Sequence, residues 1–75
     1  MNLQIFKYND TYIIYKASPI DAEYLVGYSV KGTLYIHVKR DTGFILAYID
    51  QDVNKSIMLT RKMQDEVLAF AEAKR

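Results

Sequence analysis

The segment Thr33–Asp50 constrains the fold more than any other part of the chain, because it has the pattern of a β-hairpin with unequal arms. The first arm alternates in character, since successive side chains of a strand point to opposite faces. One face carries Leu34, Ile36 and Val38, and the other carries Tyr35, His37 and Lys39. The second arm, Phe44–Ile49, is apolar at every position, which is typical of a strand covered on both faces. We therefore predict that this hairpin forms the middle of the fold.

The register of the central hairpin has two solutions. Gly43 suits the left-handed position after a type I turn, and that turn pairs Val38 with Leu46. A four-residue loop instead pairs Val38 with Ile45. The two registers turn opposite faces of the second arm inward, and hydrophobicity does not choose between them because both faces are apolar.

A second hairpin is predicted at the N-terminus, where Leu3–Tyr8 and Thr11–Lys16 flank Asn9 and Asp10. These two turn residues tolerate the left-handed conformation that a tight hairpin loop requires. In that register Tyr8 opposes Thr11. The stretch Tyr12–Tyr15 is again apolar on both faces.

Residues 18–31 have two interpretations. Ser18 followed by Pro19 has the pattern of a helix start, and Gly27 is placed to end a short helix. Alternatively, Glu23–Lys31 is a strand, since apolar and other residues mostly alternate along it. We prefer the strand, in which Gly27 marks a bulge or a close backbone approach.

The C-terminal part contains the one long helical pattern. We expect Gln51–Lys55 to be a polar connection and Ser56–Leu59 to be a short strand or a lead-in to the helix. Thr60 is the expected N-cap of a helix over Arg61–Lys74. Its apolar stripe consists of Leu59, Met63, Val67, Phe70, Ala71 and Lys74, with Leu68 at the margin. The predicted fold is α+β: an antiparallel meander of four to five strands, with the C-terminal helix packed on one face.

Length and charge narrow the class of protein. Seventy-five residues make one domain, residues 1–75. Ten Lys and Arg against nine Asp and Glu leave a net charge of +1, whereas dedicated nucleic-acid binders usually carry a clearer basic excess. The chain has no cysteine, no signal-peptide pattern and no apolar run of membrane-spanning length. We expect a soluble, cytoplasmic protein that does not interact with membranes.

One tripeptide has a catalytic counterpart. Asp41, Thr42 and Gly43 resemble the sequence that carries the catalytic carboxylate in pepsin-like and retroviral aspartic proteases. The resemblance covers only these three residues, and Lys39 and Arg40 stand where those enzymes have apolar residues. The tripeptide is also an ordinary hairpin turn, so we expect no catalysis by it.

Metal binding is not expected either. Asp50, Asp52 and Asn54 have the spacing of the first ligands of an EF-hand calcium loop, but Lys55 replaces its glycine and Arg61 its bidentate glutamate. His37 is the only histidine and has no partner in sequence. We predict a non-catalytic protein without cofactor or metal.

The seven tyrosines have two interpretations. Tyrosine suits strands and half-buried positions, which is the preferred explanation. It also supplies large, stiff contact area with a polar tip, which suggests a binding face. One long helix covers about one face of a small sheet, so the other face is expected to be apolar and to form an interface. We expect its centre at Tyr35 and Tyr48, with His37 and Tyr12 beside them.

The expected function is that of a small protein-binding module, a bacterial or phage accessory protein that occupies a partner surface. The expected assembly is a homodimer, or a weakly dimerising monomer that uses the same face for its target. The alternative is a nucleic-acid-binding regulator using an aromatic and basic strand face. Gathering of basic side chains on one face would favour that alternative; the candidates are Lys7, Lys16, Lys31, Lys39 and Arg40.

Overall fold

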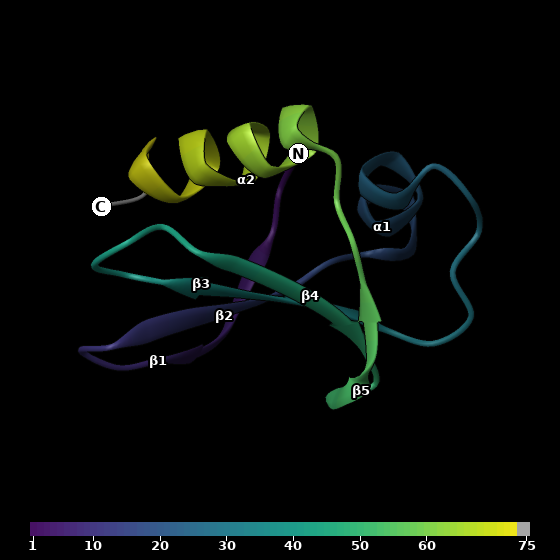
Figure 1. The fold of residues 1–75 in the computed structure, drawn as a ribbon. Helices are drawn as coiled ribbons and strands as arrows, with labels where there is room; N and C mark the ends of the chain where they lie inside the picture. The colour runs from purple at the N-terminus through teal and green to yellow at the C-terminus, as the bar shows by residue number, and fades with distance from the viewer. Residues whose placement is uncertain (74–75) are drawn as a thin grey trace.

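The computed structural model describes residues 1–73 and confirms an α+β fold with a five-stranded antiparallel meander (Figure 1). The strands follow one another in the order β1-β2-β3-β4-β5, each paired with the next. The elements are β1 (Gln4–Tyr8), β2 (Tyr12–Lys16), α1 (Pro19–Val26), β3 (Leu34–Lys39), β4 (Ile45–Ile49), β5 (Asp52–Ile57) and α2 (Arg61–Ala73).

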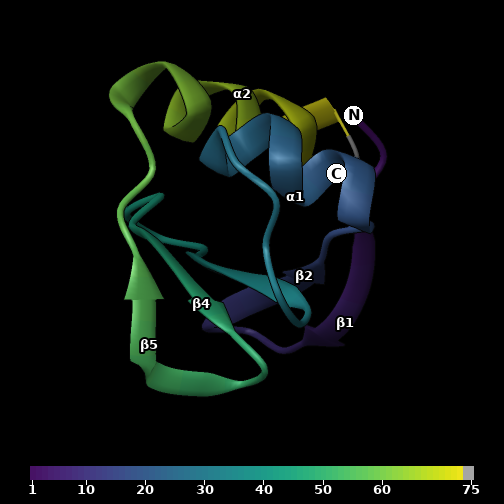
Figure 2. The ribbon, with the colours of Figure 1, turned by 90° about the vertical axis from the view of Figure 1, so that its right-hand side faces the viewer.

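Both helices lie on the same face of the sheet, and the opposite face carries no helix (Figures 1 and 2). The main core fills the space between the sheet and the helices. Leu34, Ile36 and Val67 are fully buried there. A hydrogen bond from the Tyr24 hydroxyl to Glu66, with an O–O distance of 2.7 Å, joins α1 to α2.

Helix α1 replaces the strand that was expected over Glu23–Lys31, and that prediction was wrong. Ser18 caps the helix, since its Oγ accepts a hydrogen bond from the Asp21 N–H at 3.2 Å. Gly27 ends it with a φ of 93°. Ala22 and Leu25, three residues apart, are both buried. Local capping and this helical spacing therefore outweigh the alternating pattern.

The register predicted for the N-terminal hairpin was also wrong. Tyr8 pairs with Ile13 rather than with Thr11, and a bulge separates Ile5 from Lys7. The Asn9 Oδ1 accepts hydrogen bonds from the N–H groups of Thr11 and Tyr12, each at 2.9 Å. This side chain therefore moves the turn one residue further along the chain.

The central hairpin adopts the four-residue loop, with Val38 paired to Ile45. The Lys39 N–H donates to the Phe44 carbonyl oxygen at 2.8 Å, and Gly43 has the left-handed φ of 74°. In this register Ala47 joins the main core, while Tyr48 lies on the opposite face.

The polar connection expected over Gln51–Lys55 is mostly strand, because β5 begins at Asp52. Asp50 and Gln51 form the preceding tight turn with φ values of 53° and 61°, as two-residue hairpin loops require. The N-cap prediction is confirmed: the Thr60 Oγ1 accepts from the Met63 N–H at 3.3 Å. The predicted stripe residue Lys74 lies outside the described residues.

Candidate binding surface on the open face of the sheet

The face of the sheet opposite the helices, here called the open face, is built from three cross-strand rows. Residues paired across an antiparallel sheet lie on the same face, and successive rows are about 6.6 Å apart, two residues along a strand. The first row is Tyr12, Lys39 and Phe44. The second row is Lys7, Ile14, His37 and Leu46. The third row is Gln4, Lys16, Tyr35, Tyr48 and Ser56.

The centre of the open face is a small core of its own. Tyr35, Tyr48 and Ile14 are only 7%, 5% and 9% exposed, although no helix lies above them. The Tyr35 and Tyr48 rings stack with centroids 6.1 Å apart, and Phe6 meets Tyr35 edge-on at 4.9 Å. Side chains of neighbouring strands therefore cover Tyr35 and Tyr48, the two residues that we expected at the centre of an interface with a partner.

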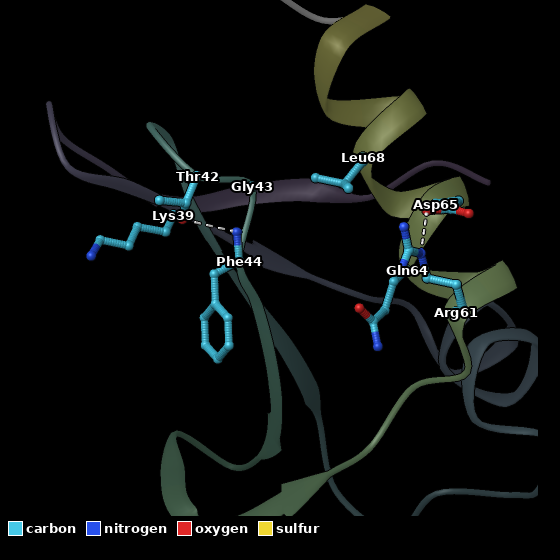
Figure 3. Close-up of a pocket in the computed structure, with 8 residues that line it drawn as sticks. All are labelled: Lys39, Thr42, Gly43, Phe44, Arg61, Gln64, Asp65 and Leu68. Carbon is cyan, nitrogen blue, oxygen red and sulfur yellow. Dashed lines mark hydrogen bonds and ion pairs between the residues drawn. The ribbon is translucent and has the colours of Figure 1, made fainter.

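Four other rings around this centre are accessible. Phe6 and Phe44 are 46% and 62% exposed, and Phe44 points away from α2 (Figure 3). Tyr12 and His37 are half-buried, with ring centroids 4.4 Å apart. Burial lowers the pKa of His37 from its ordinary value, which favours the neutral imidazole.

The structure thus brings all four predicted site residues together on one face, but at two depths. Tyr12 and His37 reach the surface, whereas Tyr35 and Tyr48 form the floor. Burial, together with the nearby hydroxyls of Tyr12 and Tyr35, raises the pKa of Tyr48 above its ordinary value. Sequence reasoning missed the exposed rings of Phe6 and Phe44. A signal for Phe44 was present in the second arm of the central hairpin, which is apolar on both faces.

Charge is distributed unevenly between the two sides of the molecule. Each row of the open face contains one exposed lysine: Lys39, Lys7 or Lys16. Asp52 is the only acidic residue in the five strands, and it pairs with Ile49, which packs against the main core. The open face is therefore basic, although the net charge of the whole chain is only +1. Asp52 lies in β5, and the other eight acidic residues lie in helices and loops: Asp10, Asp21, Glu23, Asp41, Asp50, Asp65, Glu66 and Glu72.

Two of the five basic residues considered in the sequence analysis lie elsewhere. Arg40 sits over the Tyr8 ring at 4.7 Å, and its Nη1 donates to the Asn9 carbonyl oxygen at 3.0 Å. Lys31 lies in the connection between α1 and β3.

A separate groove of about 560 Å³ lies between α2 and the tip of the central hairpin (Figure 3). The tripeptide with a protease counterpart forms part of this tip, where its residues have turn roles. Gly43 takes a positive φ, and the Thr42 Oγ1 accepts from the Phe44 N–H at 3.2 Å.

The carboxylates with calcium-loop spacing accept hydrogen bonds from backbone N–H groups. Asp50 accepts from the Thr33 N–H at 2.9 Å, and Asp52 from the Asn54 N–H at 3.0 Å. Within residues 1–73, no group of three or more His, Cys, Asp or Glu side chains is placed to hold a metal ion.

Neither of the helices in the described part of the chain is long and apolar enough to span a membrane. Comparisons of the chain with protein-family models, curated proteins and solved structures gave no match. The surface chemistry of the open face is therefore the basis for a functional proposal.

Proposed function

We propose that this protein is a small non-catalytic binding module that acts by occupying a surface of its partner, to which it binds through its open face. One observation carries the proposal: this face combines accessible rings with one lysine per row and no carboxylate in any of its three rows. The other face of the sheet is covered by α1 and α2 (Figure 2). A module of this kind fits a cytoplasmic accessory or regulatory protein of bacterial or phage origin.

A protein partner is the first candidate, as expected from the sequence. Phe6, Tyr12 and Phe44 supply aromatic contact area of the kind that dominates protein interfaces. A second copy of the chain would bring two sets of lysines towards each other, so dimerisation through this face is expected to be weak at low salt.

Nucleic acid is the second candidate, and the position of the lysines favours it. Three of the five basic residues considered lie on the open face: Lys7, Lys16 and Lys39. The near-neutral total charge is weaker evidence against this candidate, because none of the acidic residues is among the residues that form the three rows of the open face.

The proposal is tested by capture from lysates of bacterial cells, with and without nuclease. The immobilised wild type is compared with Lys16→Glu/Lys39→Glu and with the control Lys31→Glu/Lys62→Glu. Both variants change the net charge equally, and only the first changes the open face. Circular dichroism checks that both are folded. Retention of a partner by the wild type and the control alone supports the proposal. Equal retention by all three proteins, or none by any, contradicts it.

A further inference from the structure

The rows of the open face form a repeat of cations and rings. Lys39 in the first row stands between Tyr12 and Phe44, and Lys7 in the second row shares that row with His37. Lys16 in the third row lies beside the floor ring of Tyr35, against which Phe6 packs. Each row thus holds one cation. The three cations lie on β3, β1 and β2 in turn, so neighbouring ones are separated by about 6.6 Å along the strands and also by one or two strand spacings of about 4.8 Å across them.

This arrangement differs from that of an ordinary protein interface, in which an apolar centre is surrounded by a polar rim. Here the central rings of Tyr35 and Tyr48 are already buried within one chain. The exposed residues Phe6 and Phe44 lie towards opposite sides of the face: Phe6 is part of β1, and Phe44 directly precedes β4. A lysine lies in every row, including the middle one. The complementary ligand therefore has recurring anions and recurring flat apolar groups.

Single-stranded nucleic acid has this composition, because each nucleotide joins one phosphate to one base. Lysines on the open face can contact phosphates of one strand, and accessible rings can stack on bases. A duplex fits less well, since its bases are already stacked and groove reading uses a protruding helix or ribbon. Helices α1 and α2 lie on the face of the sheet opposite the open face, so neither protrudes from the open face (Figure 1).

We propose that the open face binds single-stranded DNA or RNA, with Lys7, Lys16 and Lys39 contacting phosphates and Phe44, Tyr12 and Phe6 stacking on bases. The inference rests on the proposed function and selects nucleic acid, the second of its two candidate partners. Binding is independent of base sequence, because stacking and phosphate contacts do not read base edges.

Salt dependence gives a quantitative expectation. Three lysine–phosphate contacts to a single strand predict a slope of about −2 for log K against log salt, which lowers affinity about 20-fold between 50 and 200 mM. Removing one contact reduces the magnitude of this slope by about 0.7. Removing a stacking ring weakens affinity by about 5- to 150-fold at every salt concentration.

The test is fluorescence anisotropy with labelled oligothymidylate and oligouridylate across this salt range. We expect Lys39→Gln to lower both affinity and slope, and Phe44→Ala to lower affinity with an unchanged slope. Lys62→Gln, which changes an exposed lysine of α2, should behave as wild type. Phe44 is 62% exposed, so Phe44→Ala should remain folded, which circular dichroism verifies.

The same assay includes a labelled duplex and labelled poly-glutamate. Tighter binding of poly-glutamate than of the oligonucleotides overturns the inference in favour of an acidic protein partner. Equal binding of duplex, with Phe44→Ala unchanged, also overturns it, because stacking then plays no part. If no oligonucleotide binds but cellular proteins are still captured through the open face, this inference is wrong and the proposed function stands.

Discussion

Replacing Val67 with Asp should unfold much of the protein. Val67 lies on α2, is fully buried, and belongs to the main core. The change loses about 2 kcal/mol of apolar burial and places a carboxylate without a partner in apolar surroundings, for a total cost above about 4 kcal/mol. A domain of this length is stable by about 4–11 kcal/mol. Each kcal/mol lowers the Tm of such a domain by about 4–8 °C, so a fall of at least about 16 °C is expected.

Thermal melts followed by circular dichroism measure this effect. Phe70→Asp should act in the same direction, because Phe70 packs edge-on against the Tyr15 ring at 5.6 Å. The matched control is Ala69→Asp, which adds the same charge to an exposed position of the same helix and costs about 0.7 kcal/mol in helix propensity. Glu72→Asp should be nearly silent. Melting curves of Val67→Asp and Ala69→Asp that overlay would refute the packing of α2 described above.

Three further outcomes are expected. Asp41→Asn should leave any activity of the protein intact, while Gly43→Val should lower the Tm, because Gly43 has a φ of 74° that a β-branched residue resists. Loss of activity in a folded Asp41→Asn protein would argue against a non-catalytic role. Unfolding by urea should become easier as pH falls through about 6.5, the ordinary pKa of histidine. Burial lowers the pKa of His37 in the folded state, so the unfolded chain binds a proton at a higher pH than the folded protein does. His37 is the only histidine. A His37→Gln variant whose stability shows the same pH dependence as that of the wild type would contradict this assignment. Light scattering at several concentrations should show weak self-association that strengthens with salt, and a strictly monomeric protein at all salt concentrations would exclude the homodimer.

The elements that bury one clear apolar stripe could be predicted from the sequence. Helix α2 and strand β3 each show one clear hydrophobic periodicity. The residues of this pattern face the core, where Val67 and Ile36 are fully buried. Helix α1 could not be recognised by periodicity, because Tyr24 and Tyr28 contribute to an alternating pattern while remaining about half exposed. The features that determine this helix are local: Ser18 caps its start, and Gly27 ends it by adopting a positive φ.

The cover over the second face was harder to predict. The apolar arms suggested that a partner must cover Tyr35 and Tyr48. Instead, tyrosine rings on adjacent strands lie against each other and against Phe6. Whether large side chains cover one another depends on which residues are cross-strand neighbours, and β4 has no periodicity that reveals its neighbours.

The basic character of the open face follows from register rather than composition. Lys7, Lys16 and Lys39 are far apart in sequence and lie on three strands. They share one face because the β1 bulge directs Lys7 opposite Ile14 and because Lys16 pairs with Tyr35. A shift of one residue in either pairing would send a lysine to the helix side, since side chains alternate along a strand. The net charge is the same in every register, so it carries no information about this separation. A nearly neutral small sheet protein can therefore present a strongly polarised surface, and the charge relevant to binding is that of one face in the observed register.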